Sequence, residues 1–132
     1  MLGLFQPPAR IYLYAKNVDM RKSFDGLLGI IQAEFQKDVR QGDLFLFLNR
    51  RLDRIKLMGW DRDGLLIVYK RLEVGTFQRP VAKPGAQHVE LDATEVAILL
   101  TGIDLASVKR RRRYALPPAS EISEPSTLET GV

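Results

Sequence analysis

The 132-residue sequence has no cysteine and a single histidine, His88. The absence of cysteine excludes disulfide bonds, thiolate zinc sites and cysteine nucleophiles. No apolar run approaches the roughly 20 residues that a membrane-spanning helix needs, and residues 1–10 lack the apolar centre of a signal peptide. With 45% hydrophobic and 27% charged residues, the composition is that of a globular protein. We therefore expect one compact domain in the cytoplasm, with no cofactor.

Charge is distributed unevenly along the chain. Residues 1–118 carry all 20 basic residues and 13 of the 16 acidic ones, a net charge of +7, whereas residues 119–132 carry three glutamates and no base. Thirteen of the cations are arginine, whose planar guanidinium suits paired contacts with phosphate oxygens. A basic run at residues 109–113 is either an arm for phosphate contacts or a solvated charge cluster. This composition permits an acidic partner without requiring one.

The first third of the chain predicts a strand and then a helix. Residues 10–14 follow two prolines and predict a short strand. Asp19 is a suitable helix N-cap, because its carboxylate can accept free amide hydrogens of a first turn. Apolar side chains then recur at helical spacing on one stripe of a helix expected over residues 20–36: Phe24, Leu27, Leu28, Ile31 and Phe35.

Three strand-like segments follow, at residues 44–48, 54–60 and 65–69, and predict an antiparallel meander. Residues 80–87 predict a loop, and residues 92–95 have the form of a capping box, which opens a second helix that ends near Gly102. The predicted class is α+β: a short N-terminal strand, one amphipathic helix, a three-stranded antiparallel meander and a C-terminal helix. We expect residues 1–108 to form this domain, and residues 109–132 to be a basic run followed by an acidic, disordered tail.

Side-chain alternation sorts the meander into two faces, if Leu48 lies opposite Asp53 and Trp60 opposite Leu65. One face is purely apolar, with Leu44, Leu46, Leu48, Ile55, Leu57, Leu66 and Val68. The other mixes aromatic and basic residues: Phe45, Phe47, Arg54, Lys56, Met58, Trp60, Leu65, Ile67, Tyr69 and Arg71. This mixed face is either a nucleic-acid platform or a second core layer whose arginine and lysine side chains extend outward to solvent. It could also be a surface that the first strand or another subunit covers.

Candidate enzyme sites are weak. His88 falls in a predicted loop, and no acidic partner for it can be inferred. Asp53, Asp61 and Asp63 could form a carboxylate metal cluster for phosphoryl transfer, but Asp61 and Asp63 flank a tight turn, where aspartate commonly bonds its own backbone. The glycines form no nucleotide-binding pattern. The residues therefore predict a small basic domain without catalytic or metal-binding residues.

Several motifs are more specific than these patterns. Residues 19–27 read DMRKSFDGL, and they are followed in order by GDLFLF (42–47), NRR (49–51), DRIKL (53–57), WD (60–61), KRLE (70–73) and LLTGID (99–104). Over roughly residues 10–104 the sequence resembles the TnpB-type accessory protein of insertion-sequence sixty-six elements, the Orf2-like product of the second open reading frame. Residues 105–132 lie outside this resemblance.

The resemblance implies a non-catalytic accessory role in transposition, beside a separate transposase. We expect DNA of the element ends and the transposase as its partners. A basic surface for DNA is expected from eight cations: Arg21, Lys22, Arg50, Arg51, Arg54, Lys56, Lys70 and Arg71. We expect Arg21 and Lys22 in the first turn of the first helix, where a phosphate would also be stabilised by the helix end.

Two alternatives remain open beside DNA binding. Asp25 and Glu73 could pair with the predicted cations and make them a structural network. The chain could also be a protein-interaction or self-association module that regulates the transposase through Phe45, Phe47, Trp60 and Tyr69 without contacting DNA.

Overall fold

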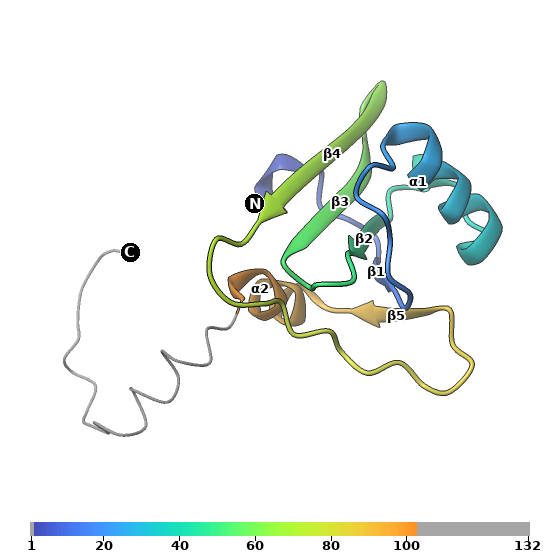
Figure 1. Cartoon of the computed structure of the whole chain (residues 1–132). Helices are drawn as coiled ribbons and strands as arrows, with labels where there is room; N and C mark the ends of the chain where they lie inside the picture. The colour runs from blue at the N-terminus through green and yellow to red at the C-terminus, as the bar shows by residue number, and fades with distance from the viewer. Residues whose placement is uncertain (1, 103–132) are drawn as a thin grey trace, which may run out of the picture. The chain divides into compact units, whose positions relative to one another are not determined.

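A five-stranded mixed sheet forms the centre of the computed structural model, which describes residues 2–102 (Figure 1). The strands are β1 (Ile11–Tyr14), β2 (Leu44–Leu48), β3 (Arg54–Asp61), β4 (Gly64–Arg71) and β5 (His88–Leu91), in the order β4-β3-β2-β1-β5. Strand β1 is parallel to β2 and antiparallel to β5, and β2, β3 and β4 form an antiparallel meander. The helices are α1 (Phe24–Ile30), continued by the π-helical turn η2 (Ile31–Phe35), and α2 (Ala93–Thr101), with 3₁₀ turns η1 (Leu2–Leu4) and η3 (Val39–Gln41). The predicted α+β class and the meander are confirmed.

The sheet buries a separate apolar layer on each face. Helix α2 supplies Val96, Leu99 and Leu100 to the layer that contains Leu44, Leu46, Leu48, Ile55 and Leu57. On the opposite face, Leu27, Ile31 and Phe35 of α1 and η2 cover Tyr12, Tyr14, Phe45, Phe47 and Met58. The mixed aromatic face of the meander is therefore largely a second core layer. Its aromatic residues Phe45 and Phe47 are fully buried and are unavailable to a nucleic acid or a protein partner.

An aromatic cluster fixes the helix on this second layer. The ring of Phe35 lies 5.0 Å from Phe45 and 5.8 Å from Tyr14, centroid to centroid, and is stacked at 4.9 Å on His88. Aromatic pairs at such distances contribute about 0.5–1.5 kcal/mol each beyond their burial. The helix that connects the parallel strands β1 and β2 is thus held over the middle of the sheet.

The first helix begins at Phe24, four residues later than the sequence predicts. The carboxylate of Asp19 accepts a hydrogen bond from the Arg21 amide, which makes a local turn and not a helix cap. The carbonyls of Met20 and Lys22 accept hydrogen bonds from the buried Lys56 ammonium. The first helical hydrogen bond comes later, from the Leu27 amide to the carbonyl of Ser23. Arg21 and Lys22 therefore precede the helix, and the expected contribution of its N-terminus to a phosphate site there is wrong.

The strand registers differ from the prediction at one place. Trp60 pairs with Leu65 as predicted, but Leu48 pairs with Ile55 and not with Asp53. A shift of two residues preserves the alternation of side chains, so the predicted division into two faces holds despite it.

Strand β5 is an element that the sequence analysis missed, and it places His88 in the sheet and not in a loop. The capping box at Asp92 and Glu95 is confirmed and opens α2 directly after this strand. No helix of the described residues 2–102 is long and apolar enough to cross a membrane. The predicted boundary at residue 108, the basic run and the acidic tail lie outside the described residues.

Candidate nucleic-acid interface

The loop between β2 and β3 presents two neighbouring arginines, Arg50 and Arg51, and both are exposed. The Asn49 side chain organises this loop, because its oxygen accepts the backbone amides of Asp53 and Arg54 while its nitrogen donates to the Asp53 carboxylate. Within residues 2–102, neither Arg50 nor Arg51 forms an ion pair with an acidic side chain. The two guanidinium groups are thus held at the surface without an acidic partner in that part of the chain.

Backbone hydrogen bonds pin the same loop to the segment that follows β4. The Leu72 amide donates to the Asp53 carbonyl at 2.7 Å, and the Phe77 amide donates to the Leu52 carbonyl at 2.7 Å. Leu52 has a φ of 59°, a left-handed conformation that costs a leucine on the order of 1 kcal/mol. Its side chain packs against the apolar core. This packing offsets the energetic cost of the Leu52 conformation. Together with the two hydrogen bonds, it fixes the loop that carries the two arginines.

The segment after β1 lies beside this loop. The Val18 amide donates to the Leu48 carbonyl at 2.8 Å, and Arg79 donates to the carbonyls of Tyr14 and Ala15 and to the Asn17 side chain. Arg79 thereby fixes the chain between β1 and α1. No local pattern in the sequence marks Arg79, because its partners lie more than 60 residues away in the chain.

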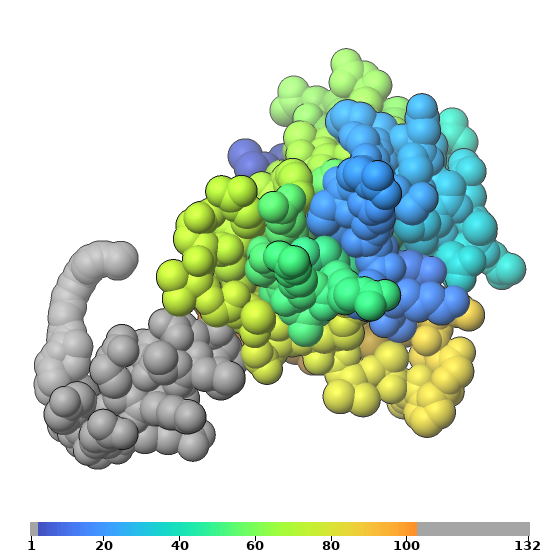
Figure 2. Space-filling view, viewed as in Figure 1, coloured from blue at the N-terminus to red at the C-terminus, as the bar shows by residue number. Residues whose placement is uncertain are grey.

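These two segments enclose an open depression of about 580 Å³, lined by Asn17, Val18, Asp19, Met20, Asn49, Arg50, Arg51, Asp53 and Arg54. Figure 2 shows the green region around residue 50 next to the blue region around residue 20 on one side of the molecule. Two acidic residues, Asp19 and Asp53, line this depression, and each is already bonded. Asp53 is bound by Asn49, and Asp19 is paired with Arg21 at 2.6 Å. The Arg21 side chain, followed by its amide, lowers the pKa of Asp19 to about 2.

Arg54 and Arg71 extend this surface onto the sheet. They are directly opposite each other on β3 and β4, an arrangement of like charges that is unfavourable in a sheet. Arg54 donates to the Tyr69 hydroxyl at 3.1 Å, while Arg71 pairs with Glu73 at 2.9 Å. Exposed pairs of the latter kind contribute little, about 0–1 kcal/mol, so a phosphate could displace Glu73. The pairing of Glu73 with a predicted cation is thus found only at Arg71.

We call this surface the basic face and define it by six exposed or half-exposed cations of the predicted set: Arg21, Lys22, Arg50, Arg51, Arg54 and Arg71. Residues from three separate parts of the chain meet there. Asp19 and Met20, which adjoin Arg21, line the same depression as Arg54, and Arg71 is opposite Arg54 on β4.

The structure places Lys56 inside the protein, so it does not belong to the basic face. Its side chain is buried, with 6% exposure of the residue, and its ammonium donates to the carbonyls of Met20 and Lys22 at 2.8 and 2.6 Å. The same ammonium lies 4.7 Å from the centre of the Tyr69 ring. Lys56 thus anchors the segment that carries Arg21 and Lys22 to the sheet.

Lys70 is also outside the basic face. Its neighbours Tyr69 and Arg71 point to the α1 side of the sheet, and alternation directs Lys70 to the α2 side. There its ammonium donates to the Leu100 carbonyl at 2.7 Å, near the C-terminal end of α2. A cation at this position satisfies an otherwise free helix carbonyl and is favoured by the helix dipole. Lys70 therefore has a structural contact on the opposite side from the six cations.

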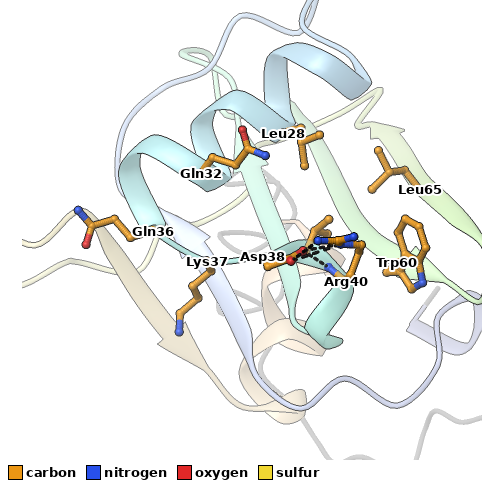
Figure 3. A pocket seen from close by; sticks show the side chains of 9 residues that line it. Leu28, Gln32, Gln36, Lys37, Asp38, Arg40, Trp60 and Leu65 are labelled. Atoms are coloured by element: carbon orange, nitrogen blue, oxygen red, sulfur yellow. Dashed lines mark hydrogen bonds and ion pairs between the residues drawn. The ribbon is translucent and has the colours of Figure 1, made fainter.

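A second hollow, of about 530 Å³, lies between the end of the first helix and the β3–β4 hairpin. Figure 3 shows Trp60 and Leu65 of the hairpin on one side and Gln32 and Gln36 on the other, with the ion pair of Asp38 and Arg40 between them. Trp60 is half-buried and donates its indole hydrogen to the Arg62 carbonyl. We call this hollow the tryptophan groove.

The three aspartates considered for a metal cluster do not come together. Asp53 precedes β3, whereas Asp61 ends that strand and Asp63 follows it, so an eight-residue strand separates them. Such a strand spans about 25 Å. Among residues 2–102, no group of three histidine or acidic side chains is placed to hold a metal ion.

Comparison with known proteins gives concordant matches. The model of the family described as "IS66 Orf2 like protein" matches residues 9–110. The uncharacterized protein y4jC of Sinorhizobium fredii (strain NBRC 101917 / NGR234) is 34% identical over 102 residues, which are 77% of this chain and 86% of that protein. The uncharacterized protein y4hO of the same strain is 30% identical over 95 residues, 72% of this chain and 81% of that protein. No solved structure matches the chain.

Proposed function

This chain belongs to the IS66 Orf2-like family, a family of accessory proteins in transposition, and on that premise we propose that it binds DNA at the ends of its element through the basic face. The protein has no catalytic step of its own in this proposal. It supplies phosphate contacts that help the separate transposase to engage the element ends.

The observation that supports this proposal most directly is the presentation of Arg50 and Arg51. Their loop is held by five hydrogen bonds, three of the Asn49 side chain and one each from the Leu72 and Phe77 amides, and it carries a strained backbone at Leu52. Both guanidinium groups are exposed and carry no ion pair within residues 2–102. A fixed loop with two arginines that carry no ion pair there suits phosphate, because little backbone freedom is then lost on binding.

The test is a binding titration against duplex DNA of the element ends at several salt concentrations. Each phosphate contact contributes about 0.9 to the slope of log affinity against log salt. Arg50→Ala with Arg51→Ala should therefore reduce the slope by about 2 and weaken binding, without changing the unfolding midpoint. Arg62→Ala, in the turn at the far end of β3, is a matched control for loss of an exposed arginine. Undetectable binding, or binding that salt does not weaken, would exclude the proposal.

A second candidate function is docking on the transposase, and the tryptophan groove favours it. The groove combines the apolar side chains of Leu28, Trp60 and Leu65 with polar and charged residues, and an apolar centre with a polar rim is typical of a protein interface. Trp60→Ala should then reduce retention of the transposase in co-purification by tenfold or more, while Arg50→Ala with Arg51→Ala leaves it unchanged. Equal retention by the Trp60 variant and the unaltered protein would contradict this docking site.

A further inference from the structure

Tyr69 is the exposed aromatic residue of the basic face. Its residue exposure is 47%, although the ring lies on the same side of the sheet as the buried Phe45 and Phe47. Strand β4 is an edge strand of the sheet, so no strand of residues 2–102 lies beyond Tyr69. One face of the ring is covered by the Lys56 ammonium of the neighbouring strand, and nearly half of the residue remains accessible to a ligand.

The ring is held from two sides. Its hydroxyl accepts a hydrogen bond from Arg54 at 3.1 Å, and the Lys56 ammonium lies 4.7 Å from its centre. Lys56 is itself fixed by two backbone carbonyls of the segment before α1. An aromatic ring whose position is already fixed loses little freedom when a flat partner stacks on it.

Cations surround this ring. Arg71 is two residues from Tyr69 on the same strand and side, about 7 Å along β4, and Arg54 is opposite Arg71. An aromatic ring beside arginines is the arrangement with which proteins bind single-stranded nucleic acid: the base stacks on the ring and the flanking phosphates contact the cations. In a continuous duplex the bases are stacked on each other and cannot reach such a ring.

The geometry points to Tyr69 as a stacking site for an unpaired base, so that the basic face takes DNA with a single-stranded segment as well as duplex. This inference rests on the proposed function, because it uses the same arginines for the phosphates. The ligand is single-stranded or locally opened DNA, in which Tyr69 contacts a base and Arg54 and Arg71 contact the adjoining phosphates.

The experiment compares a fluorescein-labelled oligodeoxythymidine with a duplex of element-end sequence, using Tyr69→Leu and Tyr69→Phe. Leucine keeps an apolar side chain and removes the aromatic face, whereas phenylalanine keeps the face and removes the hydroxyl. We expect Tyr69→Leu to weaken single-strand binding at least fivefold and duplex binding less than twofold. Tyr69→Phe should bind both within twofold of the unaltered protein. Ile98→Ala, an exposed apolar residue on α2, is the control and should change neither.

A second measurement does not depend on affinity. An oligodeoxythymidine with one 5-iodouracil should cross-link on irradiation to Tyr69, identified by mass spectrometry, and the cross-link should be absent with Tyr69→Leu. Single-strand binding unchanged by Tyr69→Leu, equal losses on both DNA forms, or cross-links only elsewhere would overturn the inference. If duplex binding still depends on Arg50 and Arg51 in that case, the proposed function stands alone. If the protein binds neither single-stranded nor duplex DNA, both the inference and the proposed function are wrong.

Discussion

Replacing Lys56 by methionine should destabilise the domain and leave the ionic part of DNA binding unchanged. The ammonium donates to two backbone carbonyls, at 2.8 and 2.6 Å, and lies over the Tyr69 ring, while the residue is 6% exposed. Methionine has a similar length and fills the same space, so the change removes the two hydrogen bonds and the charge without opening a cavity.

The magnitude follows from two opposing contributions. Hydrogen bonds from a charged donor stabilise by about 1.5–3 kcal/mol each, so losing two costs roughly 3–6 kcal/mol. Methionine avoids the desolvation of a buried ammonium, which offsets part of this cost. We expect a net loss of about 2–3 kcal/mol in the free energy of unfolding. With a urea dependence of about 1–1.5 kcal/mol per molar, the midpoint should fall by roughly 1.3–3 M.

Urea unfolding followed by the fluorescence of Trp60, the single tryptophan, measures this change. Lys22→Met is the matched control, because Lys22 is exposed and its side chain should contribute less than about 0.5 kcal/mol to stability. Under folding conditions, the salt slope of DNA binding should be the same for Lys56→Met and the unaltered protein, since the ammonium does not reach a phosphate. An unchanged urea midpoint would refute the structural role of Lys56. A slope of log affinity against log salt that is reduced by about 0.9 would show that Lys56 contacts a phosphate and belongs to the basic face.

Four further predictions concern stability. Gly59→Ala should destabilise by about 1–3 kcal/mol, because the new Cβ would lie 2.9 Å from a ring carbon of Phe5. Gly29→Ala, which meets nothing within 4 Å in α1, should instead stabilise by about 0.5–1 kcal/mol, and urea midpoints compare the two. Asp92→Ala should cost about 1 kcal/mol through loss of the capping box, as thermal unfolding against Asp92→Asn would measure. Burial lowers the pKa of His88 below 6.5, so the unfolded chain binds this proton at higher pH than the folded one. Stability should therefore fall as the pH drops below about 6.5, by more than in His88→Gln, and a rise on acidification would contradict this sign.

Local patterns predicted the strands and the second helix well, because their signals lie within a few residues. Alternation defined both faces of the meander, and a register error of two residues left those faces intact. The capping box fixed the start of α2 from four consecutive residues. Strand β5 has only four residues and pairs with β1, some 75 positions earlier in the chain, so its strongest determinant is not local.

The candidate site was predicted as a set of cations but not as a geometry. Six of the eight predicted residues lie on the basic face. The other two, Lys56 and Lys70, also lie in the basic segments of the sequence, but both donate to backbone carbonyls at least 30 residues away in the chain. Charge alone cannot separate a lysine that contacts solvent from one that satisfies distant carbonyls. The exposure of Tyr69 could not be predicted for a related reason, because only the order of the strands shows that β4 lies at the edge of the sheet.

The position of β1 has a consequence for the order in which the domain can be completed during synthesis. This strand is the first of the chain, yet it lies between β2 and β5, and all four of its residues are buried. Its second partner ends at Leu91, so a nascent chain that stops before that residue leaves the apolar strand β1 with an unpaired edge. The meander can form while this edge is still open. Truncation before β5 should therefore produce aggregation of the chain and not a smaller folded protein.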